Sequence, residues 1–232
     1  MNVVLTGAAL AGAGAAALAH GTFHRNSWVL GASLGALPTR SRALALTFDD
    51  GPNPEATPRV LDALARADVR ATFFVLGKHA ERWPDLVRRV AEEGHQIGNH
   101  GYHHRRLHLR GPRYTHEDLQ LGTDRIAVAC GVTPRFFRAP HGFRNLWVAS
   151  VARSLEQRIV GWSLGVWDSD RPGAEVIAQR SISGVRPGTI LLLHDGDGYD
   201  PAGDRRQTSD AVPAIVNGLR DRGYRFELLP RE

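Results

Sequence analysis

Two adjacent carboxylates end the first strongly apolar run of the sequence. Asp49 and Asp50 follow residues 43–48 and precede Gly51-Pro52, which is a turn sequence. A strand that ends in this way presents both carboxylates at the carboxyl edge of a sheet, where α/β proteins hold much of their chemistry. Neighbouring carboxylates repel each other, and a divalent metal separates their roles by taking one as a ligand and leaving the other as a base. The alternative is an acidic turn in which water solvates both groups.

A pair of histidines supplies further metal ligands. His100 and His104 are four residues apart, after a short predicted strand at residues 96–98. On a helical turn this spacing puts both imidazoles on one face, where they can bind one ion. With Asp50 they form a set that suits Zn²⁺, and also Co²⁺, Ni²⁺ or Fe²⁺. Two solvated surface histidines are the alternative, but both motifs follow strands and should therefore meet at one edge of the sheet.

Another predicted strand, at residues 135–138, ends in a charged side chain. Arg138 can pair there with a catalytic carboxylate and keep it ionised. The sequence Pro140-His141-Gly142 then shapes a loop whose backbone N–H can face an oxyanion. A loop with an incidental ion pair is the alternative.

A fourth motif is a histidine at the end of an apolar strand. His194 follows residues 189–193, a run that includes Leu192. An imidazole beside such an apolar wall can protonate a leaving amine. A structural histidine is the alternative.

The elements that must position these residues alternate regularly. The predicted strands cover residues 43–48, 71–76, 96–98, 135–138, 158–162, 189–193 and 225–229. The predicted helices cover residues 60–67, 84–93, 115–130, 146–155, 174–183 and 210–222, with Thr57 as N-cap of the first and Thr115 with Asp118 as capping box of the third. This alternation predicts an α/β fold with a parallel sheet, and seven strands favour an incomplete or distorted barrel over a regular eight-stranded one.

Composition narrows the classes of protein. With 42% hydrophobic and 23% charged residues among 232, the chain is an ordinary globular protein with room for one large domain. The net charge of +5 is not concentrated in any basic run, so we predict no nucleic-acid partner. Cys130 is the only cysteine, which excludes an intrachain disulfide and a cysteine zinc site. Nothing in the composition selects an oligomeric state.

The first 40 residues differ from the rest. Residues 3–19 are uncharged and rich in Ala and Gly, but no Lys or Arg precedes them and their side chains are small. This makes a weak signal peptide and a marginal spanning helix. We predict that residues 1–40 are a membrane anchor or export segment, which implies a cell-envelope location, and that residues 41–232 are the catalytic domain. A flexible or packed extension is the alternative.

Taken together, the motifs resemble those of a known family. Residues 47–51, the pair His100 and His104, residues 138–142 and residues 192–194 are similar, in order, to the motifs of the polysaccharide deacetylases, the NodB-homology proteins of carbohydrate esterase family 4. The resemblance covers residues 43–229. It implies a distorted (β/α)₇ barrel and a metal-dependent hydrolase that removes N-acetyl, less often O-acetyl, groups from an acetylated polysaccharide or oligosaccharide by attack of a metal-activated water.

The resemblance also implies a role for each site residue. Asp49 matches the general base, with Arg138 as the partner that holds it, and His194 matches the general acid. Asp168 aligns with the carboxylate that tunes this acid. The metal ligands are Asp50, His100 and His104, and the implied ion is Zn²⁺, with Co²⁺ or Ni²⁺ as alternatives. The backbone N–H of His141 would help to stabilise the oxyanion. The residues that would contact substrate are Pro140, His141, Gly142, Trp167 and Leu192.

Three positions depart from the family pattern. Gly101 replaces the usual Ser or Thr, which should cost a hydrogen bond in the loop. His141 replaces an aromatic residue, and Ser169 stands where Trp is expected, so that Trp167 would fill the groove from a neighbouring position. Substrate preference is the inference that these departures affect most.

The sequence also allows two other functions. One is a catalytically silent carbohydrate-binding relative, although such a protein needs neither an acid nor a base. The other is a serine esterase, because residues 161–165 fit the pattern G-x-S-x-G around Ser163, with Asp168 or Asp170 and His194 following in hydrolase order. A nucleophile elbow must lead into a helix, and residues 166–172 are not helical in pattern.

Overall fold

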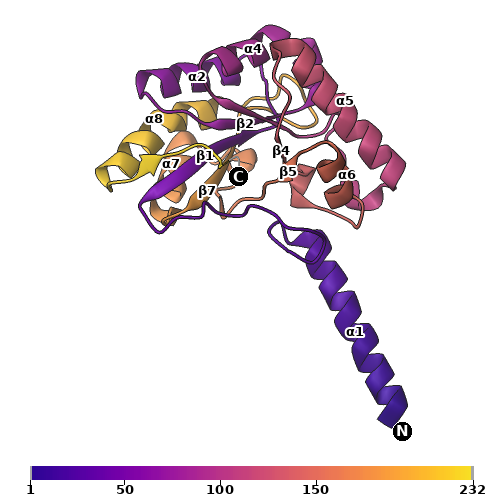
Figure 1. Cartoon of the computed structure of the whole chain (residues 1–232). Helices are drawn as coiled ribbons and strands as arrows, with labels where there is room; N and C mark the ends of the chain where they lie inside the picture. The colour runs from indigo at the N-terminus through magenta and orange to yellow at the C-terminus, as the bar shows by residue number, and fades with distance from the viewer. Residues whose placement is uncertain (1, 231–232) are drawn as a thin grey trace.

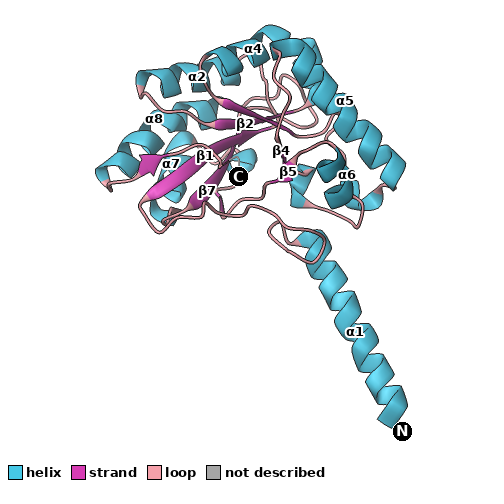
Figure 2. Ribbon diagram, in the orientation of Figure 1, coloured by secondary structure: helices cyan, strands magenta, loops and turns pink. Residues whose placement is uncertain are grey.

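A parallel sheet forms the centre of the molecule. The computed structural model describes residues 2–230, and Figure 2 shows the strands gathered inside a layer of helices. The strands are β1 (Ala43–Asp49), β2 (Thr72–Val75), β3 (Gln96–Asn99), β4 (Phe136–Phe137), β5 (Arg158–Ile159), β6 (Leu164–Gly165), β7 (Thr189–His194) and β8 (Arg225–Phe226). Their order is β5-β4-β3-β2-β1-β7-β6, with β8 paired to the start of β1, and every pairing is parallel. The predicted α/β fold with a distorted, incomplete barrel is confirmed.

The sheet is open on one side. Strands β5 and β6 are its two edges, and within residues 2–230 no strand pairing joins them. Strand β6 is an addition to the seven predicted strands, since its two residues pair only with Leu191 and Leu192 of β7. Strands β4, β5 and β8 are each two residues long, shorter than predicted.

Helices cover the outer face of the sheet. They are α2 (Ala56–Arg66), α3 (Gly77–Arg82), α4 (Pro84–Glu92), α5 (Pro112–Cys130), α6 (Val148–Ser154), α7 (Ala174–Gly184) and α8 (Arg206–Asp221). A further helix, α1 (Asn2–Phe23), lies apart from the sheet, and short 3₁₀ helices lie at Leu107–Leu109, Pro140–Gly142 and Asp168–Asp170. All seven residues of β1 are buried, and its side chains alternate between two faces. Leu46 and Phe48 join the core under α2 and α8, whereas Ala45 faces the barrel interior.

Two predicted helix starts are wrong. Helix α2 begins at Ala56, where Oδ1 of Asn53 accepts the first free N–H groups, so Thr57 is not the N-cap. Its hydroxyl instead donates to Asp195 at 2.6 Å. Helix α5 begins at Pro112, a favoured first position, rather than at a capping box. The Asp118 carboxylate accepts hydrogen bonds from the loop before α5, not from the start of the helix itself.

The N-terminal part of the chain divides into two sections. Helix α1 projects away from the rest of the molecule, as Figure 1 shows. Residues 24–40, here called the N-terminal strap, lie on the barrel. In the strap, Leu34 exchanges backbone hydrogen bonds with Ile159 and Gly161 at one edge of the open side, and Leu37 bonds Gly188 before β7. The strap therefore crosses the opening that strand pairing leaves. No helix within residues 2–230 combines the length and the hydropathy that crossing a bilayer requires.

Candidate active site

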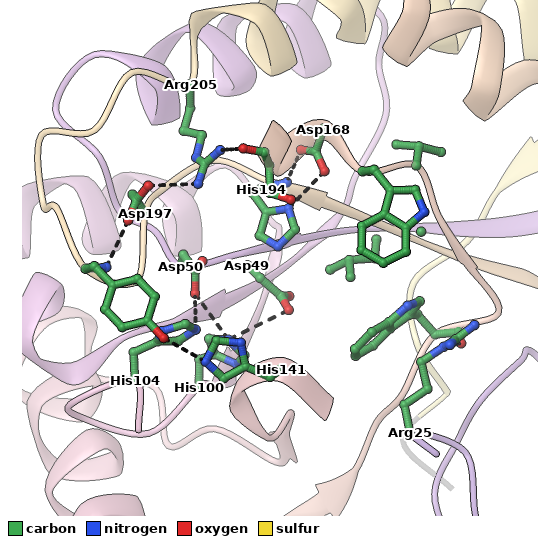
Figure 3. Close-up of a pocket in the computed structure, with 18 of the residues that line it drawn as sticks. Arg25, Asp49, Asp50, His100, His104, His141, Asp168, His194, Asp197 and Arg205 are labelled. Carbon is green, nitrogen blue, oxygen red and sulfur yellow. Dashed lines mark hydrogen bonds and ion pairs between the residues drawn. The ribbon is translucent and has the colours of Figure 1, made fainter. Parts of the chain in front are cut away.

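The strand ends meet around one cavity. Asp49 and Asp50 lie at the end of β1, His100 directly after β3, Arg138 after β4, and His194 at the end of β7. Because the strands are parallel, their carboxyl ends share one face, and the register places Asp49 directly beside His194. Figure 3 shows the side chains of Asp49, Asp50, His100 and His194 converging on the cavity, whose volume is about 650 Å³.

Three buried residues form a candidate metal site. Ligand atoms of Asp50, His100 and His104 all lie within 4.8 Å of one another. Nε2 of His104 and Nε2 of His100 lie 3.1 Å and 3.3 Å from Oδ1 of Asp50. This carboxylate oxygen is buried and has no hydrogen-bond partner in the part of the chain that the structure describes. A buried oxygen without a donor and two converging imidazoles are what a divalent cation would satisfy.

The surroundings of this site fix the state of its ligands. Nδ1 of His100 lies 2.8 Å from the backbone oxygen of Arg138, so the ring donates there and Nε2 keeps its lone pair for a ligand. Burial opposes ionisation of Asp50, but His104 and His100 outweigh it and hold the pKa of the Asp50 carboxyl well below its usual range. The residues present therefore fit a divalent metal ion.

A fully buried arginine fixes the second carboxylate. NH1 of Arg138 donates to Oδ1 of Asp49 at 2.6 Å and to the Thr47 hydroxyl at 2.8 Å, while NH2 donates to the backbone oxygen of Gly161. The Phe74 ring centroid lies 4.1 Å from the guanidinium carbon. Burial lowers the pKa of Arg138 and Asp49 opposes that shift, so the guanidinium stays charged. Oδ1 of Asp49 is thus held, and Oδ2 is left for the cavity.

A second carboxylate and imidazole pair stands across the cavity. Oδ1 of Asp168 lies 2.9 Å from Nδ1 of His194, and Oδ2 accepts from the backbone N–H of His194 and from the Thr208 hydroxyl. Burial alone would lower the pKa of His194, but the Asp168 carboxylate outweighs it and raises the pKa to about 9. His194 is therefore an imidazolium at neutral pH whose Nε2–H can be donated.

Four residues that line the cavity have a strained backbone. Asp50, His104, His141 and Trp167 have φ angles of +71°, +58°, +60° and +57°, in the left-handed region that non-glycine residues avoid. Such conformations cost about 1–3 kcal/mol each and persist where the surroundings enforce them. At His141 this conformation turns the ring towards His104, 4.7 Å away between ring centroids. Burial and the neighbouring His104 lower the pKa of His141 to about 4, so its ring is neutral.

The sequence matches a family model and several known proteins. The family model described as polysaccharide deacetylase matches residues 36–160, more than half of the chain. The chain belongs to the polysaccharide deacetylase family. A chitooligosaccharide deacetylase of Bradyrhizobium sp. (strain ANU 289) is 38% identical over 200 residues, which cover 82% of this chain and 90% of the relative.

Other relatives are named as peptidoglycan deacetylases. A peptidoglycan-N-acetylglucosamine deacetylase of Bacillus cereus (strain ATCC 14579) is 36% identical over 196 residues, covering 83% of this chain and 69% of the relative. The crystal structure of the Bc1960 peptidoglycan N-acetylglucosamine deacetylase superposes with a TM-score of 0.80 at 33% identity, covering 85% of this chain and 91% of that one. The fold is thus shared with a structurally known member of the family.

The residues predicted to contact substrate fall into two groups in this polysaccharide deacetylase. His141, Trp167 and Leu192 line the cavity, and the Trp167 side chain is 70% exposed. Pro140 and Gly142 are buried and do not line it. Their contribution is the shape of the loop backbone.

Several residues that line the cavity were not predicted as site residues. Those with large side chains include Phe23, Arg25, Phe143, Trp162, Tyr199 and the ion pair of Asp197 with Arg205. Tyr199 is on the loop after β7, and its hydroxyl lies 3.0 Å from Nε2 of His141. An aromatic residue among turn residues just after His194 was a usable signal for this loop. No sequence signal marked Phe23 and Arg25 as site residues, because they precede the stretch that resembles the family.

The serine esterase alternative is wrong. Ser163 leads into strand β6 and not into a helix. Its hydroxyl accepts a hydrogen bond from the backbone N–H of Ile190, 2.9 Å away, and it does not line the cavity. The pattern G-x-S-x-G is therefore an accident of sequence in this polysaccharide deacetylase.

Proposed function

We propose that this chain is a metal-dependent deacetylase that hydrolyses the N-acetyl groups of N-acetylglucosamine residues in an oligosaccharide or in peptidoglycan. The observation that carries the proposal is the pairing on either side of the candidate metal site. Arg138 holds Asp49 on one side, and Asp168 holds a protonated His194 on the other. A base and an acid across one cavity from a metal site are the groups that amide hydrolysis requires.

The metal would be held by Asp50, His100 and His104, whose ligand atoms already converge. We assign Zn²⁺ first and Co²⁺ or Ni²⁺ as alternatives, because a set of two histidines and one carboxylate accepts all three. When bound, such an ion polarises the acetyl carbonyl and lowers the pKa of water.

The side chains of the chain itself would move the protons. Oδ2 of Asp49 takes a proton from the attacking water, while Arg138 holds the carboxylate in place through Oδ1. The backbone N–H of His141 donates to the oxyanion that forms on the acetyl oxygen. Nε2 of His194 gives its proton to the leaving nitrogen as the C–N bond breaks, and the products are acetate and a free amine. No covalent intermediate is needed.

The walls of the cavity would hold the sugar. Aromatic rings bury the apolar faces of sugars, so the exposed Trp167 and the Leu192 side chain form one side of the groove, with His141 on the other. Pro140 and Gly142 act by shaping the loop of His141. We place the protein at the cell envelope, with residues 1–40 as a membrane or export segment and residues 41–232 as the part that carries the catalytic groups.

A catalytically silent carbohydrate-binding relative is the second candidate function. The ion pairs of Arg138 with Asp49 and of His194 with Asp168 argue against a binding-only protein. Sugar binding requires neither a base held by an arginine nor a protonated acid. Turnover separates the two candidates.

The test is acetate release from N-acetylglucosamine oligomers by the 232-residue chain, measured before chelation, after chelation, and after Zn²⁺ or Co²⁺ is restored. We expect release that the chelator abolishes and the metal restores. Ser163→Ala is the matched control and should leave release within about 2-fold, since the Ser163 hydroxyl bonds only the backbone of β7. Metal-loaded protein that releases no acetate from oligomers or peptidoglycan would instead support the silent relative.

A further inference from the structure

One wall of the cavity comes from the N-terminal part of the chain. Phe23, at the end of α1, and Arg25, in the strap, both line the cavity, as Figure 3 shows for Arg25. Arg144, which is fully buried, fixes this segment: its side chain donates to the backbone oxygens of Ser27 at 2.5 Å and Gly31 at 3.0 Å. The wall is thus anchored to the barrel and has a defined place in the site.

The Arg25 guanidinium is held against a tryptophan. Its Nε donates to the backbone oxygen of Trp162 at 2.8 Å, and its guanidinium carbon lies 5.0 Å from the Trp162 ring centroid. The Arg25 Cβ comes so close to Gly142 that a Cβ at that glycine would lie 3.0 Å from it. Arg25 therefore abuts the same loop that carries His141, next to the position proposed for the reacting acetyl group.

The charge of Arg25 contacts the Trp162 ring but has no carboxylate partner among the residues that the structure describes. The other arginine that lines the cavity, Arg205, pairs with Asp197 at 2.9 Å and also donates to two backbone oxygens. Across residues 2–230, no carboxylate forms an ion pair with Arg25, and its two terminal nitrogens donate no hydrogen bond. Burial lowers its pKa, yet a guanidinium stays charged at neutral pH.

A half-buried cation with two free donors is suited to an anion. The terminal nitrogens of a guanidinium form a planar fork that matches a carboxylate with two parallel hydrogen bonds. Because Nε is already bound to Trp162, the fork is oriented before any ligand arrives, and less entropy is lost on binding. Neutral hydroxyl groups of a sugar would use the hydrogen bonds but not the charge.

We propose that Arg25 binds a carboxylate on the sugar next to the one that is deacetylated. The preferred substrate is then a glycan that alternates N-acetylglucosamine with a carboxylate-bearing sugar, and not a neutral N-acetylglucosamine oligomer. The cavity of about 650 Å³ is in the range that holds ligands larger than one small ring. This inference rests on the proposed deacetylase function and narrows its substrate class.

The test compares two substrates that differ only in the carboxylate. One is a peptide-free tetrasaccharide from peptidoglycan, which carries free lactyl carboxylates, and the other is the same tetrasaccharide with these groups reduced to alcohols. For the wild-type 232-residue chain we expect kcat/KM to be at least about 10-fold higher on the acidic form. In Arg25→Gln this ratio should fall to about 1, chiefly by loss of rate on the acidic form, and Arg25→Lys should keep part of it.

Arg153→Gln is the matched control, because Arg153 is exposed on α6 and does not line the cavity, so the ratio should stay at its wild-type value. Thermal unfolding of each variant shows whether the strap remains folded. A wild-type ratio near 1, or an Arg25→Gln variant that slows both substrates by the same factor, overturns the assignment of Arg25. Wild-type protein that releases acetate from neither form contradicts the deacetylase function itself, which is a separate outcome.

Discussion

Nδ1 of His194 lies 2.9 Å from Oδ1 of Asp168, and the second oxygen of the same carboxylate accepts the backbone N–H of His194. One carboxylate therefore sets both the orientation and the protonation of the proposed acid. The raised pKa of about 9 means that His194 keeps its proton below that pH and loses it above.

This relationship predicts the alkaline limb of the pH profile. We expect kcat/KM of the wild type to fall as pH rises through about 9, because the acid form of His194 is lost there. In Asp168→Asn the stabilising charge is gone, so the limb should move to about pH 6.5 or below. Asp170→Asn, in the same 3₁₀ helix, is the control and should keep the wild-type limb. An unchanged limb in Asp168→Asn would show that another group sets it.

Substitution of the proposed base, Asp49, should separate catalysis from metal binding. Asp49→Asn removes the proton acceptor but none of the three converging metal ligands, so kcat should fall about 10²- to 10⁴-fold while bound Zn²⁺ stays stoichiometric. The measurements are acetate release and metal content of the purified variant. Loss of the metal together with the activity would show that Asp49 is also a metal ligand.

Metal removal should also be visible in stability. Zn²⁺ at about 100 times its Kd should stabilise the folded chain by about 2.7 kcal/mol, which a chelator would remove. His104→Ala should abolish this metal-dependent shift in Tm, because it removes one of three buried ligands. His116→Ala, on the exposed face of α5, is the matched histidine control. A metal-dependent shift that survives in His104→Ala would place the ion elsewhere.

The strap should matter for stability as well as for the cavity. Leu34 is 7% exposed and packs in the barrel interior with Phe74 and Ile190. Leu34→Ala should therefore lower the free energy of unfolding by about 2–5 kcal/mol, measured in urea. Leu18→Ala, at an exposed position of α1, should change it by no more than about 0.5 kcal/mol. Equal, small effects of the two substitutions would mean that the strap is not part of the folding unit.

The predictions that held have local causes. Strand β1 was predicted almost to the residue, because all of its positions are buried and the run is apolar until the carboxylates that end it. The metal ligands follow strands β1 and β3, so parallel order alone was enough to bring Asp50 and His100 together. Asp168 was found only through the family pattern, since its partner His194 is 26 residues away.

The predictions that failed depend on tertiary contacts. Strand β6 has only two residues and exists because β7 pairs with it. At Gly101 a Cβ would lie 2.5 Å from Oδ2 of Asp118, and this carboxylate braces the loop through the N–H groups of Tyr102 and His103. The hydrogen bonds that Asp118 of α5 accepts thus replace the bracing hydrogen bond that we expected Gly101 to lose. The strap carries no sequence signal for its place on the barrel.

The junction between α1 and the cavity has a mechanical consequence. The last residue of α1, Phe23, already lines the cavity, and the strap that follows is fixed to the barrel. A helix of 22 residues is a rod of about 33 Å, and no slack separates it from the domain. If residues 1–40 anchor the chain, as proposed above, α1 would set the distance between the anchor and the active site and limit the volume that the site can search.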